Sequence, residues 1–147
     1  MKCSRMIFLL GFLMFALVPC FAHHMAVVVN KNNSMADIPS TQLARIFLLE
    51  AKKWGDGKEV TLVLHKDSSG EMLTLEHLSK MSSSDWKAFV TSHKDSFTWV
   101  DSDDDVLHVI ETTPGAIGLV EVHSINDQVT VLKVSGKLPM EAGYLPH

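Results

Sequence analysis

Two patterns of hydrophobic and polar residues alternate along most of this chain. The first is a short apolar run rich in β-branched residues, which occurs at residues 25–29, 60–64, 116–122 and 129–134. Such runs, bounded by polar or turn residues, are typical of strands buried on both faces of a sheet. We therefore expect four strands, with a turn at Asn126-Asp127 between the last two.

The second pattern places an apolar residue at every third or fourth position, as in an amphipathic helix. It begins four times beside a serine that can cap a helix: Ser40, Ser68, Ser82 and Ser102. Thr113-Pro114-Gly115 would end the last helix. The inward-facing residues would be Leu43, Ile46 and Phe47 in the first helix, Met72, Leu75 and Leu78 in the second, Trp86, Phe89 and Val90 in the third, and Val106, Val109 and Ile110 in the fourth.

Strands that alternate with helices predict an α/β fold with a mostly parallel sheet flanked by helices. The pattern contains no internal repeat, low-complexity tract or linker. We therefore expect residues 23–147 to form a single domain.

The first 22 residues differ from the rest of the chain. Lys2 and Arg5 precede an uncharged, mostly apolar run at 6–18, and Cys20 and Ala22 supply small residues for a cut after Ala22. This is the layout of a cleavable secretory signal. The apolar run is also shorter than the roughly 20 residues that a membrane span needs. We expect a cleaved signal peptide at 1–22 and a periplasmic location, with an uncleaved anchor or a lipid on Cys20 as alternatives.

Cleavage would change the chemistry of the remaining chain. Both cysteines, Cys3 and Cys20, lie in the signal, so the mature domain would have no disulfide bond. The whole chain has a formal charge of −4, and loss of the two signal cations would leave a more acidic domain. This balance argues against nucleic acid as a partner. No second apolar stretch approaches the length of a membrane span.

The most informative segment is the junction between the strand at 60–64 and the helix near Ser68. The loop between them reads His65-Lys66-Asp67-Ser68-Ser69-Gly70. Ligands of open α/β sheets bind beyond the carboxyl ends of the strands, and a helix N-terminus offers unpaired N–H groups to an anion. We expect the N–H groups of Ser69, Gly70 and Glu71 and the hydroxyls of Ser68 and Ser69 to bind an anion, with Asn30 at the same edge.

With these residues in place, the chain resembles the periplasmic phosphate-binding proteins of ABC transporters, which are type 2 periplasmic binding proteins. The resemblance implies a periplasmic-binding-protein-like lobe in which an arginine, a serine–glycine–threonine turn and a helix N-terminus hold an oxyanion. By position, the arginine falls at His65, and the turn falls at Ser69, Gly70 and Glu71. The matching pieces, in the family's order, are Val27-Val28-Val29-Asn30, LARIFLL at 43–49 with Trp54 and Gly57 after it, Ser69-Gly70, Trp86, and PGAIGLV at 114–120.

Three features depart from the family's pattern. His65 replaces a permanent cation with a ring that is largely neutral at pH 7, and Glu71 replaces a hydroxyl donor with a carboxylate that repels anions. The chain also has residues for about one of the family's two lobes. Ser68 and Glu71 equally fit a Ser-x-x-Glu capping box, in which Glu71 would accept from the Ser68 N–H and no ligand is needed.

Other candidate chemistry gives weaker patterns. Acidic residues at 101, 103 and 105 suggest a calcium loop, but Val106 stands where glycine is needed, so a cap at Ser102 explains the run better. The histidines show no helix-face metal spacing, and no nucleophile–base pair has a matching motif. We expect no enzyme activity, no cofactor and no metal.

The resulting hypothesis is an exported solute-binding-type domain that binds phosphate or a similar small oxyanion weakly, or is an accessory to phosphate uptake. The alternative is a non-catalytic periplasmic interaction module that has lost anion binding. Its partner would be a second copy in a homodimer or another periplasmic protein.

Overall fold

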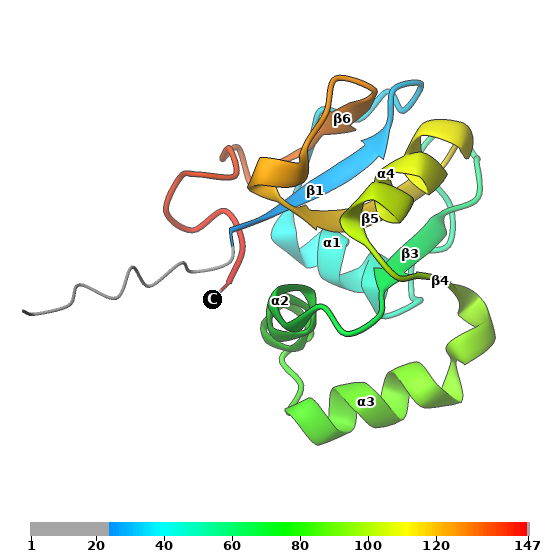
Figure 1. Cartoon of the computed structure of the whole chain (residues 1–147), viewed down its shortest axis with the longest axis vertical. Helices are drawn as coiled ribbons and strands as arrows, with labels where there is room; N and C mark the ends of the chain where they lie inside the picture. Colours follow the sequence, from blue (N-terminus) through cyan, green and yellow to red (C-terminus); the bar gives the residue numbers. More distant parts are fainter. Residues whose placement is uncertain (1–23, 147) are drawn as a thin grey trace, which may run out of the picture.

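The computed structural model describes residues 24–146, so the expected signal peptide lies outside the described residues. A five-stranded sheet in the order β4-β3-β5-β1-β6 forms its centre (Figure 1). β3 pairs in parallel with β4 and β5, whereas β1 pairs antiparallel with β5 and β6. β1 therefore runs against the other four strands, and the expected mostly parallel sheet is confirmed. The strands are β1 (Met25–Asn30), β3 (Thr61–His65), β4 (Phe97–Val100), β5 (Ala116–Glu121) and β6 (Val129–Val131).

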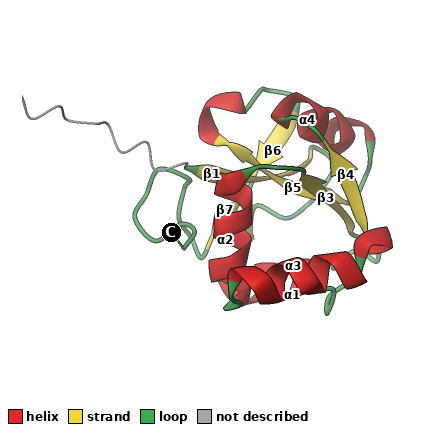
Figure 2. Cartoon of the chain, turned by 60° about the horizontal axis from the view of Figure 1, so that its bottom comes forward, coloured by secondary structure: helices red, strands yellow, loops and turns green. Residues whose placement is uncertain are grey.

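Helices cover both faces of this sheet, which explains why its strands are continuously apolar. α1 (Ser40–Phe47) and α4 (Asp103–Thr112) lie on opposite faces (Figure 2). Alternate residues of β1, β3 and β5 belong to separate core clusters. Val27, Leu62 and Leu64 pack with residues of α1 and of α2 (Ser69–Ser79), and Val28 and Val63 pack with residues of α4.

α3 (Ser83–Ser92) follows α2 and contributes Trp86 to the first of these clusters. Serine caps begin three of the four helices, as expected: the hydroxyls of Ser68, Ser82 and Ser102 each accept a hydrogen bond from a backbone N–H three residues later. The prediction for Ser40 is wrong by one residue, because Pro39 is the capping residue of α1. Proline fits this position because its fixed φ is compatible with entry into a helix.

The strand predictions also need correction, since β3 begins and ends one residue later than the predicted 60–64 run and three other differences occur elsewhere. The 129–134 run divides into β6 and β7 (Lys133–Val134), and β7 pairs with β2 (Asp37–Ile38) in a separate two-stranded sheet. The 116–122 run ends one residue early, and a 3-10 helix (Val122–Ser124) follows. β4, preceded by a 3-10 helix (Lys94–Ser96), has no counterpart among the predicted strands. It has only four residues and lies at the sheet edge, so its sequence lacks a long apolar run.

The loop after α1 and the turn before β5 meet at Trp54 and Gly115. The Trp54 Nε1–H donates to the backbone oxygen of Gly115 over 2.9 Å. Gly115 has a φ of +82°, and a Cβ at this position would lie 2.2 Å from the Glu59 backbone oxygen. Only glycine fits here without strain. The turn before β5 is thereby fixed against the loop after α1.

Candidate functional site

The junction of β3 and α2 lies at the carboxyl edge of the sheet. β3 ends at His65, and the Lys66 N–H donates to the backbone oxygen of Val100 at the end of β4. Asp67 then adopts a left-handed backbone with a φ of +60°, which turns the chain toward the helix. Ser68 is the capping residue, with an extended backbone, and α2 begins at Ser69. The sequence-based expectation of a strand, a short polar loop and a helix is confirmed.

The first turn of α2 leaves two backbone donors without an acceptor. The Glu71 N–H donates to the Ser68 hydroxyl over 3.3 Å, and the Met72 N–H donates to the Ser68 backbone oxygen over 3.0 Å. Among the residues that the structure describes, no acceptor is found for the N–H groups of Ser69 and Gly70. Ser69 is exposed and Gly70 is buried. The helix N-terminus therefore presents unpaired donors, as the first positions of a helix commonly do.

The side chain of Glu71 is buried in the same turn, with a relative exposure of 3%. Its Oε2 accepts a hydrogen bond from the His65 N–H over 2.8 Å, while its Oε1 has no partner in the described residues. The capping-box prediction is therefore confirmed for Ser68 and wrong for Glu71. Ser68 caps the helix as expected, but the Glu71 carboxyl reaches back to His65 rather than to Ser68.

Burial also changes the ionisation of Glu71. Loss of hydration raises the pKa of this carboxyl well above its ordinary value, and the nearby charge of Asp103 raises it further. The hydrogen bond from the His65 N–H acts in the opposite direction, because it favours the charged form. The neutral acid consequently persists to higher pH than in an exposed glutamate.

The His65 ring turns toward α4. Its Nδ1 lies 3.1 Å from Asp103 Oδ1, and its Nε2 lies 3.0 Å from the backbone oxygen of Asp101. Both partners only accept hydrogen bonds, so only the doubly protonated ring can donate to both at once. Asp103 Oδ2 in turn accepts from the Glu121 N–H over 3.0 Å and from the Ser124 hydroxyl over 2.8 Å. The ring thus joins the β3–α2 loop to the beginning of α4.

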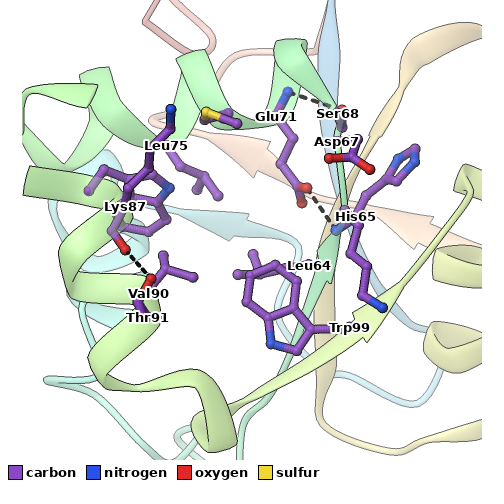
Figure 3. Close-up of a pocket in the computed structure, with 13 residues that line it drawn as sticks. Leu64, His65, Asp67, Ser68, Glu71, Leu75, Lys87, Val90, Thr91 and Trp99 are labelled. Atoms are coloured by element: carbon purple, nitrogen blue, oxygen red, sulfur yellow. Dashed lines mark hydrogen bonds between the residues drawn. The ribbon is translucent and has the colours of Figure 1, made fainter. Parts of the chain in front are cut away.

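A cavity of about 390 Å³ opens beside this junction, between α2, α3 and β4 (Figure 3). His65, Lys66, Asp67 and Ser68 line one end of it. Its remaining wall is mainly apolar and comprises Leu64, Met72, Leu75, Trp86, Val90 and Trp99, together with Glu71, Lys87 and Thr91.

The structure brings together five of the six predicted anion-binding residues: His65, Ser68, Ser69, Gly70 and Glu71. The expectation that Asn30 lies at the same edge is wrong. Because β1 is antiparallel to β5, its carboxyl end lies at the opposite edge of the sheet.

The Asn30 side chain has a structural role at that opposite edge. Its amide nitrogen donates to the backbone oxygens of Ile110 and Glu111, over 2.9 and 3.0 Å. These carbonyls belong to the last turn of α4, where intrahelical donors are lacking. Asn30 therefore stabilises the carboxyl end of a helix.

Two residues near the site have contacts that the sequence did not indicate. Asp103 was expected only as an acid in the first turn of a capped helix, yet it contacts His65, Glu121 and Ser124. Trp99 lines the cavity from β4, the strand missing from the sequence prediction. The β-branched and aromatic residues of the 97–100 run are typical of a strand, and in the structure this strand pairs with β3 so that Trp99 lies opposite Leu64, one residue before His65.

The acidic run at 101–105 behaves as a helix start. The Ser102 hydroxyl accepts from the Asp105 N–H over 3.1 Å, as expected for a cap. Within residues 24–146, no group of three histidine, cysteine, aspartate or glutamate side chains is arranged to hold a metal ion. The same residues contain no helix with the length and apolarity to cross a membrane.

Comparisons with known proteins agree with this architecture. A curated relative, the phosphate-binding protein PstS of Bacillus subtilis (strain 168), is 32% identical over 120 residues, which cover 78% of this chain and 37% of the relative. An ABC-type phosphate transport receptor from Vibrio cholerae superposes with a TM-score of 0.64 at 17% identity, over 79% of this chain and 48% of the receptor. PstS from Borrelia burgdorferi gives a TM-score of 0.60 at 18% identity, over 79% and 49%.

These comparisons define both the family and the extent of the match. The chain spans little more than a third of the curated relative and about half of the solved receptors, consistent with a single lobe. The family model for the PBP superfamily domain matches residues 15–144, which is most of the sequence. The chain therefore belongs to the PBP superfamily domain family.

Proposed function

We propose that this chain is an exported domain that binds phosphate or a similar small oxyanion weakly at the N-terminus of α2, by itself or as an accessory to phosphate uptake. The observation that carries the proposal is the pair of backbone N–H groups at Ser69 and Gly70 without an acceptor in the described chain. The name of the curated relative as a phosphate-binding protein supports the choice of ligand. The role is binding rather than catalysis.

The chemistry of the first turn suits an anion. The aligned peptide dipoles of α2 place partial positive charge at its N-terminus, where the unpaired N–H groups lie. The Ser68 oxygen accepts from the Glu71 N–H, which leaves its own hydrogen free to donate to a ligand. The exposed Ser69 offers a second hydroxyl.

Burial of Glu71 reduces the electrostatic repulsion expected between its carboxylate and an anion. An ionised carboxylate in the first turn would repel phosphate, but the raised pKa of Glu71 favours the neutral acid. The His65 ring is directed at Asp103 and Asp101, so its nitrogens are engaged within the domain and do not contact the ligand directly.

Weak binding follows from the exposure of the site. Ser69 is open to solvent, and water keeps the effective dielectric high, which weakens each charge–dipole contact. We expect a dissociation constant of millimolar order, equivalent to about 4 kcal/mol at a 1 M standard state.

Substitution at the first helical residue tests the proposal. Ser69→Pro removes one donor N–H, and proline is well tolerated at this position, particularly after the extended backbone of Ser68 (φ −79°, ψ 104°). Ser69→Ala removes the hydroxyl but keeps the N–H. Ser83→Pro places proline at the first residue of α3, behind the Ser82 cap, and is the matched control.

Calorimetric titrations with phosphate and sulfate should show loss of binding in Ser69→Pro, a smaller loss in Ser69→Ala and no change in Ser83→Pro. Equal binding by Ser69→Pro and the wild type would contradict the proposed site.

Export is tested separately, on the protein recovered from the periplasm. Mass spectrometry should find a mature chain that begins at His23, as the signal pattern at 1–22 predicts. A retained Met1, or a lipid attached to Cys20, would contradict cleavage by the proposed route.

A periplasmic interaction module remains the second candidate. It is favoured by the internal use of the His65 N–H and of both ring nitrogens, which leaves this residue no direct donor for an anion. Absence of phosphate and sulfate binding in the wild type, together with a stable folded domain, would favour this role. The partner would then be a second copy or another exported protein.

A further inference from the structure

The cavity beside the α2 N-terminus has the polar β3–α2 loop at one end, and the rest of its lining is mainly apolar, with Lys87 and Thr91 of α3 on the side away from this loop (Figure 3). The β3–α2 loop supplies the polar end, including the Ser68 cap. The apolar part is formed by Leu75, Trp86 and Val90 from the helices and Trp99 from β4, as Figure 3 shows in part. A bare inorganic oxyanion would gain nothing from this apolar wall. A volume of 390 Å³ with a mainly apolar lining falls within the range of about 300–1,000 Å³ that is typical of sites for small organic molecules.

The charges around the cavity favour an anionic head group. Lys66 lies in the loop at the polar end and Lys87 lies on α3 on the other side of the cavity, and the exposed carboxylate of the lining is Asp67 (Figure 3). Lys66 Nζ lies 3.8 Å from Asp101 Oδ1, but both side chains are largely exposed, so water and salt weaken this pair. The buried Glu71 adds little negative charge when it is neutral.

An unused hydrogen-bonding group marks the polar end as a ligand position. Glu71 is 3% exposed, and its Oε1 has no partner in the described chain. Figure 3 shows its side chain running from α2 toward His65 and Leu64, at the cavity wall. A buried polar atom without a partner is costly. In the neutral acid, Oε1 can donate its proton to a ligand oxygen while Oε2 accepts from the His65 N–H, and this hydrogen bond would relieve the cost.

We propose that this cavity binds a small organic oxyanion, such as an aryl or alkyl phosphonate or phosphate ester. The anionic head would lie at Ser68, Ser69 and Gly70, and the apolar body would pack against Trp86, Val90 and Trp99. The inference rests on the proposed oxyanion site at α2 and names its substrate class. Ser68 and Glu71 line the cavity and flank Ser69 and Gly70 in the chain, so the mainly apolar lining begins next to the donors, which is the argument for an organic substituent.

The wild-type protein tests this directly, through tryptophan fluorescence and calorimetry with four probes: phosphate, methylphosphonate, phenylphosphonate and benzyl alcohol. Phenylphosphonate should bind at least tenfold more tightly than phosphate or methylphosphonate, and benzyl alcohol should bind more weakly than phenylphosphonate. Phosphate that binds as tightly as phenylphosphonate would overturn the organic substrate class but keep the oxyanion site. Failure of all three oxyanions to bind would instead overturn the proposed function, and equal binding of benzyl alcohol and phenylphosphonate would remove the role of the anionic head.

A pair of substitutions on α3 locates the apolar body. Val90→Trp fills the cavity, whereas Ala88→Trp adds the same side chain at an exposed position of the same helix. Val90→Trp should lower the affinity for phenylphosphonate at least tenfold and leave that for phosphate unchanged, and Ala88→Trp should change neither. Equal phenylphosphonate affinities in the two variants would place the ligand outside this cavity. If Val90→Trp does not fold, as judged by circular dichroism, the wild-type comparison decides the question.

Discussion

The His65 backbone N–H donates to Glu71 Oε2 over 2.8 Å, which joins the last residue of β3 to the first turn of α2. The same carboxyl group leaves Oε1 buried without a partner. One side chain therefore stabilises the loop geometry while keeping a polar atom unsatisfied. This combination makes Glu71 the residue on which the stability and the ligand chemistry of the junction both depend.

Glu71→Gln should remove a pH dependence from the stability of the fold. Above the ordinary value of 4.5, the unfolded chain releases the Glu71 proton while the folded chain keeps it, because burial raises the folded-state pKa. The free energy of unfolding should then fall as pH rises, by at most about 1.4 kcal/mol per pH unit, until the folded-state pKa is reached.

Urea denaturation at several pH values between 4 and 8, with the wild type and Glu71→Gln side by side, measures this effect. The stability difference should increasingly favour glutamine as pH rises. A constant difference over this range would show that Glu71 has an ordinary pKa in the folded protein.

Removal of the cap at Ser68 should affect both stability and ligand binding. Ser68→Ala deletes the acceptor for the Glu71 N–H and should cost about 1 kcal/mol of unfolding free energy. The Ser82 hydroxyl is the equivalent cap of α3 and accepts from the Asp85 N–H over 3.2 Å. Ser82→Ala should therefore cost a similar amount of unfolding free energy. Only Ser68→Ala should weaken phosphate binding, by about tenfold if one hydrogen bond to a charged group is lost. Equal affinities in the two variants would exclude the Ser68 hydroxyl from the site.

Substitution of Asn30 should change the stability of the fold without changing phosphate binding. Asn30→Ala would leave two backbone oxygens at the end of α4 without their donor, at a cost of about 2 kcal/mol or more. Phosphate affinity should not change, because Asn30 lies at the opposite edge of the sheet from Ser69. Denaturant unfolding and calorimetry on one preparation give both quantities. If Asn30→Ala lowered the affinity for phosphate and left the free energy of unfolding unchanged, Asn30 would contribute to the binding site and this account would be contradicted.

Tyr144 connects the carboxyl-terminal segment to the sheet. Its hydroxyl donates to the Leu132 backbone oxygen over 2.6 Å and accepts from the Val27 N–H over 3.1 Å. Tyr144→Phe should cost about 2 kcal/mol or more of unfolding free energy, since both buried backbone groups lose their partner.

Burial also raises the pKa of Tyr144 from 10.0 to about 12. Between these values the unfolded chain loses the proton first, so stability should fall as pH rises.

The sequence contains a single tyrosine, so ultraviolet absorbance follows this group alone. A titration midpoint near that of free tyrosine, in a chain that is still folded, would contradict the buried hydrogen bonds.

The sequence predicted those features that arise from local patterns. Continuous apolar runs indicated β1, β3 and β5, and capping serines indicated the starts of α2, α3 and α4, because strand burial and helix capping depend on neighbouring residues. Strand direction is a property of the whole sheet. The antiparallel course of β1, which places Asn30 at the end of the sheet opposite the site, was therefore not apparent from the sequence.

The missed parts of the site depend on long-range pairing. β4 is short and lies at an edge, so Trp99 was not expected to line the cavity. The Glu71 carboxyl could have accepted from Ser68 or His65, and only the folded path of the loop decides between them. The contact of His65 with Asp103 joins residues 38 positions apart and has no signature in either local sequence.

The most direct test of the oxyanion site is a titration of the isotopically labelled protein with phosphate, followed by the chemical shifts of its backbone amides. The account predicts that the Ser69 and Gly70 amide signals shift most, that they saturate at millimolar phosphate, and that sulfate moves the same signals. Unchanged Ser69 and Gly70 signals at saturating phosphate, or larger shifts concentrated elsewhere in the domain, would contradict it.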